Sequence, residues 1–132
     1  MSTSMIISLI LAMAPVFNVD PHIALAVASV ESNLNPHAIG GHGEVGLFQV
    51  MPAQFKKRGY TRKQMEMPLN NIYVGLQMIA EARKSCIHKG AIHSLVCYNA
   101  GPTVAKKIKN PSKFAYVKKV TKKLLTILST GK

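Results

Sequence analysis

The chain has 132 residues, 48% of them hydrophobic, so it can bury a core but is too short for two ordinary domains. Seventeen Lys and Arg residues stand against five acidic ones, which gives a formal net charge of +12. Such a surface favours polyanionic partners, such as nucleic acid, anionic lipid or an acidic cell-wall polymer, although a solvated lysine face is an equally good interpretation. We therefore expect one domain over residues 1–132.

Residues 5–15, MIISLILAMAP, have the apolar character of a signal-peptide core, and Ala12–Ala14 has the form of a cleavage site. However, no basic residues precede the stretch, Pro15 would directly follow the cut, and the segment is too short to span a bilayer. We therefore predict that residues 1–19 form the first helix of the domain, with a removed leader as the alternative.

Asp20-Pro21 is a strong helix start, because Asp caps free amides and Pro fits the first helical position. The predicted helix runs to Glu31. Residues 32–46, SNLNPHAIGGHGEVG, are rich in glycine and favour a tight loop or small hairpin. Pro52 then opens a short helix that we expect to end at Lys57.

Three helical segments follow. The first carries a stripe at helical spacing that we expect to be core, with Gly75 allowing close helix packing, and its members are Leu69, Ile72, Leu76, Ile79 and Ala80. The second, within residues 93–110, is interrupted at Gly101-Pro102. The last has a lysine-rich face, ends in the basic residues 121–132, and has an apolar face made of Phe114, Val117, Val120, Leu124, Ile127 and Leu128. The fold class is therefore mainly α.

Cysteine and histidine residues give weaker signals. Two cysteines, Cys86 and Cys97, make no disulfide framework in a chain with an adequate core, so we expect free, mostly buried thiols, with a pair as the alternative. His37, His42 and Glu44 share the glycine-rich segment, but no helical spacing supports a metal site there, and none is predicted. The other histidines, which we expect at the surface, are His22, His88 and His93.

Glu31 directly follows the small apolar run AVASV. Burial disfavours the charged form of a carboxyl group, so its pKa should rise, and a group still protonated near neutral pH can give its proton to a leaving oxygen. Taken alone, Glu31 is more simply a helix cap or a surface partner of a lysine. The residues that accompany it favour the chemical role.

Four motifs occur in order: Glu31-Ser32, GLFQVMP over residues 46–52, YNAG over residues 98–101, and Tyr116 in the last helix. Gln49 lies eighteen positions after Glu31. The series resembles the soluble lytic transglycosylase domain of the lysozyme-like superfamily, and the match covers roughly residues 20 to 120. The resemblance implies a mainly helical, lysozyme-like α+β fold.

The resemblance also implies roles for individual residues. Glu31 would be the single catalytic acid and base, and Tyr116 would hydrogen-bond its carboxylate. Gln49 and Met51 would line the floor of the site, while Tyr98 and Asn99 would hold the N-acetyl region of a sugar. Simpler readings stay open for these residues: core packing for Met51, loop support for Gln49, apolar packing for Tyr116 and a helix-end cap for Asn99.

The implied reaction cleaves the β-1,4 bond between N-acetylmuramic acid and N-acetylglucosamine in peptidoglycan and closes a 1,6-anhydro ring. It needs no cofactor. Gly40 and Ser112 stand where many members of the family have a serine and an acidic residue that help to position the catalytic group and substrate. Glu44 replaces a small residue, so a hydrolase that uses Glu44 as a second carboxylate is the alternative.

A different class of function is a catalytically degenerate, basic component of a virion or secretion machine that binds the wall or an anionic membrane. Nucleic acid is not expected, because aromatic residues do not alternate with basic ones. The last helix could lie on lipid, but packing against the core is the favoured reading. We expect the partners to be peptidoglycan glycan strands, the anionic envelope surface and virion or secretion-apparatus proteins. Action at the bacterial cell wall or periplasm, after delivery by a phage, is the favoured localisation.

Overall fold

The computed structural model describes residues 1–86 and 90–131. Apart from two short 3-10 helices at Ala14–Phe17 and Pro111–Lys113, its regular structure is α-helical. The helices are α1 (Thr3–Met13), α2 (Pro21–Ser32), α3 (Pro52–Lys57), α4 (Arg62–Met65), α5 (Pro68–Cys86), α6 (Gly90–Ala100), α7 (Pro102–Lys107) and α8 (Ala115–Thr130). In place of a hairpin, the segment between α2 and α3 has only the isolated bridges Ile39–Val45 and Val45–Val50.

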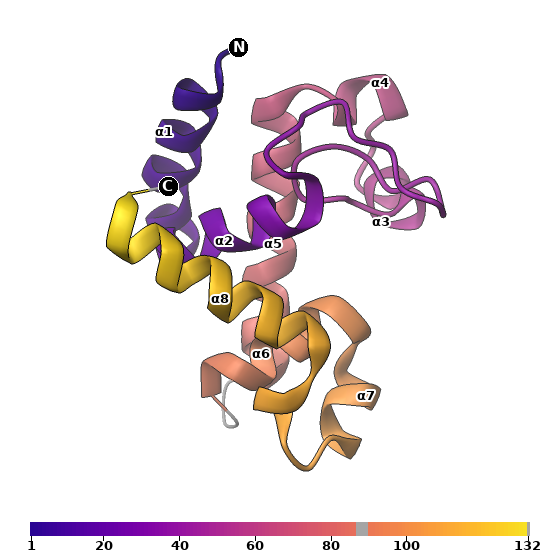
Figure 1. Ribbon diagram of the computed structural model, residues 1–132. Coiled ribbons are helices and arrows are strands. Elements are labelled where there is room, and N and C mark those ends of the chain that lie inside the picture. Colours follow the sequence, from indigo (N-terminus) through magenta and orange to yellow (C-terminus); the bar gives the residue numbers. More distant parts are fainter. Residues whose placement is uncertain (87–89, 132) are drawn as a thin grey trace.

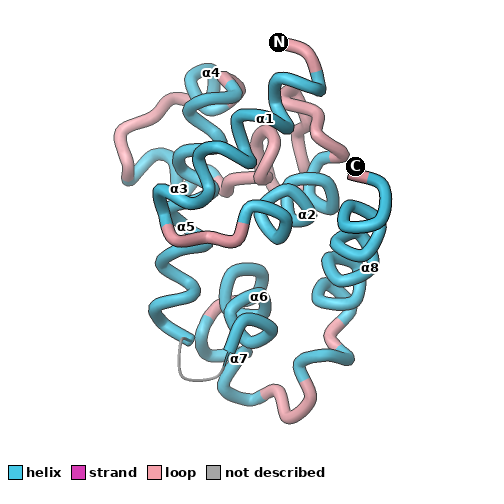
Figure 2. The backbone as a smooth tube through the Cα atoms, turned by 90° about the vertical axis from the view of Figure 1, so that its left-hand side faces the viewer, coloured by secondary structure: helices cyan, strands magenta, loops and turns pink. Residues whose placement is uncertain are grey.

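Two groups of helices lie at opposite ends of the long helix α5 (Figure 1). Helices α3 and α4 lie at one end together with residues 33–51, here called the glycine loop, and α6 and α7 lie at the other end (Figures 1 and 2). Helix α8 packs on α2 and also touches α6. The last residues of α2 are close to the glycine loop and to α8, through the hydrogen bonds of Ser32 with Leu47 and of Glu31 with Tyr116.

The first helix is shorter than the predicted span of residues 1–19, because α1 ends at Met13 and a 3-10 helix follows. Pro15 explains the change: it lacks an N–H group, and its ring clashes with the carbonyl of the preceding turn. Ile6 and Ile10 of α1 are fully buried, and the helix packs on α2 and α5. Asp20 caps α2 as predicted, accepting hydrogen bonds from the backbone N–H groups of His22 and Ile23 at 2.9 and 3.0 Å.

Most of the predicted stripe on α5 is core, with Ile72, Leu76 and Ile79 buried and Ala80 half-buried. Leu69 is an exception, because it lies in the first turn of α5, where the side chain is exposed. Gly75 permits a close approach: a Cβ there would lie 2.7 Å from the Cβ of Phe48, whose ring fills the space. Phe48 is fully buried, so the glycine loop packs directly on α5.

The expectation of free thiols is wrong, because Cys86 and Cys97 form a disulfide. The size of the core decides whether a fold needs a crosslink, but not whether two cysteines meet: the end of α5 lies beside α6, with the two Cα atoms 6.7 Å apart. Both cysteines are buried, as predicted. The interruption at Gly101-Pro102 is also confirmed, since α6 ends at Ala100 and α7 begins at Pro102.

Helix α8 packs its apolar face on α2, as favoured above, with Val117, Val120 and Ile127 buried. Phe114 and Leu124 are half-buried, but Leu128 is exposed, in contrast to the prediction. Lysines on the opposite face, such as Lys118 and Lys122, are exposed. Within the described residues, no helix has the length and apolar character needed to cross a membrane.

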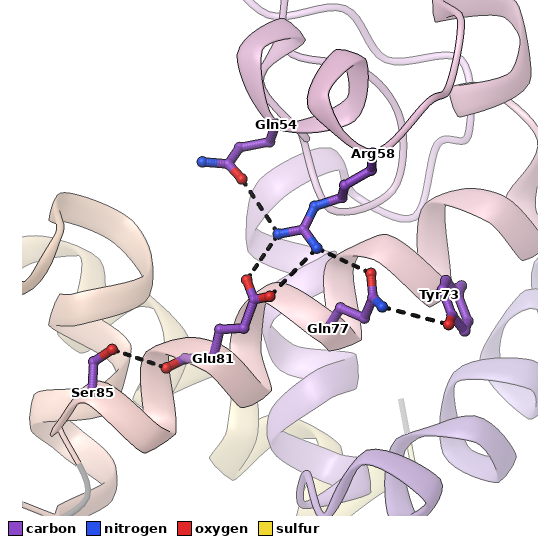
Figure 3. Close-up of polar contacts among 6 residues, drawn as sticks. All are labelled: Gln54, Arg58, Tyr73, Gln77, Glu81 and Ser85. Atoms are coloured by element: carbon purple, nitrogen blue, oxygen red, sulfur yellow. Dashed lines mark hydrogen bonds and ion pairs between the residues drawn. The ribbon is translucent and has the colours of Figure 1, made fainter.

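A polar cluster joins the end of α3 to α5 at the junction shown in Figure 3. Arg58 donates hydrogen bonds to Glu81 Oε1 at 2.8 Å and to Gln77 Oε1 at 3.1 Å. The side chain of Arg58 is 14% exposed and that of Glu81 is 60% exposed. The largely buried Arg58, through its hydrogen bonds to Gln77 and Glu81, thus fixes the end of α3 against α5.

Candidate active site

Glu31 lies in the last turn of α2. Asn33 and Leu34, with φ values of 53° and 58°, end the helix in the left-handed region and turn the chain into the glycine loop. Ser32 donates from Oγ to the carbonyl oxygen of Leu47 at 2.8 Å, so the far side of the loop is tied back to the helix end. This contact explains structurally why a serine follows Glu31.

The surroundings of Glu31 favour its neutral form. Burial raises the pKa of its carboxyl group from 4.5 to about 7, and the negative charge of Glu44 acts in the same direction, while the hydrogen bond from Tyr116 opposes both. Carbonyl groups at the C-terminal end of α2 also carry partial negative charge, which disfavours a carboxylate there. Glu31 can therefore still hold a proton near neutral pH, as a general acid requires.

Two tyrosines from distant helices lie at this carboxyl group. The hydroxyl of Tyr116, in the first turn of α8, donates to Glu31 Oε2 at 3.0 Å, which is the hydrogen bond implied by the family resemblance. Tyr98, near the end of α6, donates to the carbonyl oxygen of Phe48 at 3.3 Å. Burial raises the pKa of both tyrosines above the ordinary value, so both hydroxyls keep their protons and act as donors.

The backbone of the glycine loop depends on Asn71, which the sequence analysis did not single out. This fully buried residue of α5 accepts from the N–H of Phe48 at 2.8 Å and donates to the carbonyl oxygens of Val45 and Met65 at 2.8 and 3.0 Å. In the sequence, Asn71 can be recognised as an amide side chain within an apolar helical stripe, next to Ile72. Such a residue needs buried partners, and a neighbouring loop can supply them.

The remaining predicted site residues have diverse environments. Gln49 is half-buried, with an unusual φ of 49°, and its Nε2 donates to the carbonyl oxygens of Ala38 and Gly46 at 3.1 and 3.0 Å. It therefore supports the loop, whatever else it does. Met51 is 42% exposed at the start of α3 and is not a core residue. Asn99 is exposed inside the last turn of α6 and does not act as a cap.

Glu44 turns back over the glycine loop instead of extending into solvent. Its Oε1 accepts from the backbone N–H of His42 at 2.6 Å, and its side chain is 24% exposed. Hydrogen bonds from the backbone amides of Glu44 itself and of His42 lower the pKa of this carboxyl group. The two carboxyl groups thus differ at neutral pH: Glu44 is ionised, whereas Glu31 can hold a proton.

The histidines of the loop point to separate carboxylates. His42 Nδ1 lies 4.0 Å from Glu44, whereas His37 Nδ1 lies 3.4 Å from Glu66 of the α4–α5 region. No group of three metal-ligating side chains gathers anywhere in residues 1–86 and 90–131. Of the other histidines, His22 is exposed and His93 half-buried, while His88 is outside the described residues.

The chain is similar to known proteins in sequence and in fold. The family model for the transglycosylase SLT domain matches residues 8–120. A protein named transglycosylase from Enterobacteria phage PRD1 is 38% identical over 65 residues, which is 49% of this chain and 24% of that protein.

The crystal structure of the 70 kDa soluble lytic transglycosylase from Escherichia coli has a similar fold over 89% of this chain and 21% of that one, with a TM-score of 0.68 and 24% identity. The chain thus spans about a quarter or less of the length of these two relatives. The family match extends from α1 into α8 and includes every helix that contributes to the site. The chain belongs to the transglycosylase SLT domain family.

Proposed function

We propose that this chain is a peptidoglycan lytic transglycosylase with Glu31 as its single general acid and base. The observation that carries the proposal is a buried carboxyl group with a pKa raised to about 7, held by the Tyr116 hydroxyl, in a chain of the SLT family. The bond to be cleaved joins N-acetylmuramic acid to N-acetylglucosamine.

In the first half of the reaction, Glu31 transfers its proton to the bridging oxygen, and the bond from that oxygen to C1 of the muramic acid breaks. Positive charge develops at C1, where the neighbouring N-acetyl oxygen can stabilise it. Tyr116 already donates to Oε2 of Glu31. The proton therefore leaves from Oε1, and the tyrosine stabilises the carboxylate that remains.

In the second half, the Glu31 carboxylate takes the proton of the muramic acid 6-hydroxyl while the oxygen of that hydroxyl bonds to C1. The products are a 1,6-anhydro sugar and a free N-acetylglucosamine end, and Glu31 is protonated again. No water is consumed, and one carboxyl group serves both halves. We assign Gln49 and Met51 to the floor of the binding site, and Tyr98 and Asn99 to the N-acetyl region of the sugar.

Glu44 supports a second candidate, a hydrolase. It is ionised, and its charge acts on Glu31, so it could instead take a proton from a water that attacks C1. The two candidates differ in product, because hydrolysis leaves a reducing end and no anhydro sugar. The catalytically degenerate wall- or membrane-binding component remains a third candidate.

The deciding experiment is mass spectrometry of soluble products from purified peptidoglycan treated with the wild type and with Glu31→Gln. Anhydromuropeptides from the wild type alone support the transglycosylase, and the loss should be at least about 10²- to 10⁴-fold. Reducing-end products would transfer the assignment to the hydrolase. Equal activity of both proteins would mean that Glu31 is not the catalytic acid. No product from either protein would reject an enzymatic function.

We also propose delivery by a phage to the bacterial cell wall or periplasm, supported by the similarity to a transglycosylase of phage PRD1. The net charge of +12 would concentrate the protein at an anionic envelope surface. Virion or secretion-apparatus proteins are the proposed partners in delivery.

A further inference from the structure

An open pocket, here called the basic pocket, lies between α8 and α2. Its volume is about 310 Å³, and it is lined by Val30 of α2 and by four residues of α8: Lys119, Lys122, Lys123 and Thr126. The four positions follow one another at helical spacing, so one side of α8 forms a wall of the pocket. Lys119 and Lys122 are exposed and Lys123 is half-buried, so three lysine side chains border a space that solvent can enter.

The positive charge of the basic pocket is not balanced by carboxylates of the protein. Glu81 is the last acidic residue in the sequence, so α8 carries lysines and no acid. In the part of the chain that the structure describes, the ion pairs lie elsewhere, at His37, His42 and Arg58. Like charges on one side of a helix repel one another, so a bound anion would stabilise this arrangement.

The basic pocket lies next to the proposed catalytic group. Val30 directly precedes Glu31 in α2. Lys119 and Lys123 follow Tyr116 by three and seven residues, a spacing that places all three on one face of α8. That face carries the hydrogen bond from Tyr116 to Glu31. With a rise of about 1.5 Å per residue, the two lysines lie about 4.5 and about 10.5 Å along the helix from Tyr116. Substituents of a sugar ring at Glu31 can therefore reach the pocket.

The substrate of the proposed reaction carries anions near the bond that is cleaved. In peptidoglycan, the lactyl group of N-acetylmuramic acid is joined to a short peptide, the peptide stem, which has free carboxylates. The sugar rings themselves are then uncharged. Lysine is a point charge on a flexible side chain, which suits a carboxylate on an equally flexible peptide. The stem of the muramic acid bound at Glu31 is therefore the best match for the basic pocket.

We propose that the basic pocket binds a carboxylate of this peptide stem and makes the protein prefer stem-bearing glycan. The inference deepens the proposed function and rests on it. The lysines of the pocket form no ion pair with Glu31 within the described residues, so they are available to the stem while Glu31 keeps its proton. A phosphate of another envelope polymer would also pair with lysine, but a position next to Glu31 favours a group that is attached to the substrate.

The test measures binding in the Glu31→Gln background, which separates binding from cleavage. Isothermal titration calorimetry compares tetrasaccharides of alternating N-acetylglucosamine and N-acetylmuramic acid that carry peptide stems, stems with amidated carboxylates, or no peptide. The parent should bind the first ligand about fivefold more tightly than the other two, as expected for exposed ion pairs. Adding Lys119→Gln and Lys122→Gln together should abolish this preference and leave the affinity for the peptide-free ligand unchanged.

The matched control is Lys113→Gln combined with Lys118→Gln, which removes two positive charges from exposed lysines that do not line the pocket. The control should keep the preference for charged stems. An equal loss in both double variants would mean that net charge alone attracts the stem, and it would overturn the pocket. Equal binding of charged and amidated stems by the parent would also overturn the pocket and leave the proposed function intact. No binding of any of these ligands by the parent would overturn the proposed function, and the pocket with it.

Discussion

Glu31 and Glu81 lie in two regions of the protein that treat a carboxyl group in opposite ways. At the end of α2, burial raises the pKa of Glu31 to about 7, and its hydrogen-bond partner is the neutral Tyr116. On α5, the hydrogen bond and charge of Arg58 hold the pKa of the exposed Glu81 below its usual range. The same side chain is thus prepared to give a proton in one region and to stay ionised in the other.

The comparison shows that the partner and the degree of burial, more than the residue type, decide what a carboxyl group can do. A cation beside Glu31 would stabilise the carboxylate and remove the proton that the first half of the reaction needs. The chain is rich in lysine, yet the hydrogen-bond partner of Glu31 is a tyrosine. Within the described residues, no lysine or arginine forms an ion pair with Glu31.

The largest expected effect concerns the activity of the wild type above neutral pH. If protonated Glu31 is the acid, kcat/KM should fall about tenfold for each pH unit above its pKa of about 7. Release of soluble products from peptidoglycan, measured at constant ionic strength, gives this profile. A limb near the ordinary carboxyl value of 4.5 would contradict the difference drawn between Glu31 and Glu81.

Folding stability should show the same difference in the Glu31→Gln variant. Because the pKa of Glu31 is higher in the folded chain, the wild type loses stability as the pH rises from 4.5 to about 7. The total corresponds to about 3 kcal/mol, as an upper value. Urea denaturation should therefore find Glu31→Gln more stable than the wild type at pH 8 and equal to it at pH 4. A difference that does not change with pH would argue against the buried acid.

Replacing Tyr116 with phenylalanine should separate the pKa of Glu31 from its activity. The Tyr116 hydroxyl lowers the pKa of Glu31, so its removal should shift the basic limb to higher pH. The rate should nevertheless fall roughly tenfold, because the carboxylate formed during the reaction loses a hydrogen bond.

Tyr73→Phe is the control for this variant, since the Tyr73 hydroxyl accepts a hydrogen bond from Gln77 at the α5 polar cluster (Figure 3). It should leave both the rate and the limb unchanged. If Tyr116→Phe lowers the rate but leaves the basic limb of the pH profile at the same pH, Tyr116 only packs against the site and does not set the pKa of Glu31.

The smallest effect is expected at Glu81. Its folded-state pKa is lowered, so the pair with Arg58 stabilises the fold above the unfolded pKa and loses this contribution as the pH falls through the folded value. Glu81→Gln should cost less than about 1 kcal/mol at pH 7, because Glu81 is largely in solvent. A double-mutant cycle with Arg58→Met measures the coupling, which should vanish in strong acid. A coupling that stays the same in strong acid would contradict the lowered pKa of Glu81.

Local patterns predicted much of the helical framework. Asp20-Pro21 and Pro52 start α2 and α3 as expected, and Gly101-Pro102 separates α6 from α7. These features depend on capping and on the restricted backbone of proline, which act over a few residues. For the same reason Pro15, also a local signal, ended the first helix earlier than the apolar pattern suggested.

Contacts between distant segments were less accessible from the pattern. The spacing of apolar residues could not show that α5 and α6 bring Cys86 and Cys97 together, or that Leu69 and Leu128 are exposed. Asn71 was hidden in an apolar stripe because its three partners come from other segments.

The sequence by itself determined which carboxyl group stands at the end of α2 and which motifs accompany it, because residue type and spacing are properties of the chain. Only the tertiary structure decided that Glu31 holds a proton. Its raised pKa depends on burial and on a tyrosine 85 residues away along the chain. The packing of the Glu44 and Gln49 side chains against Gly40 likewise exists only once the loop has folded. Solvation and electrostatic energies depend on distances in space, and folding sets those distances.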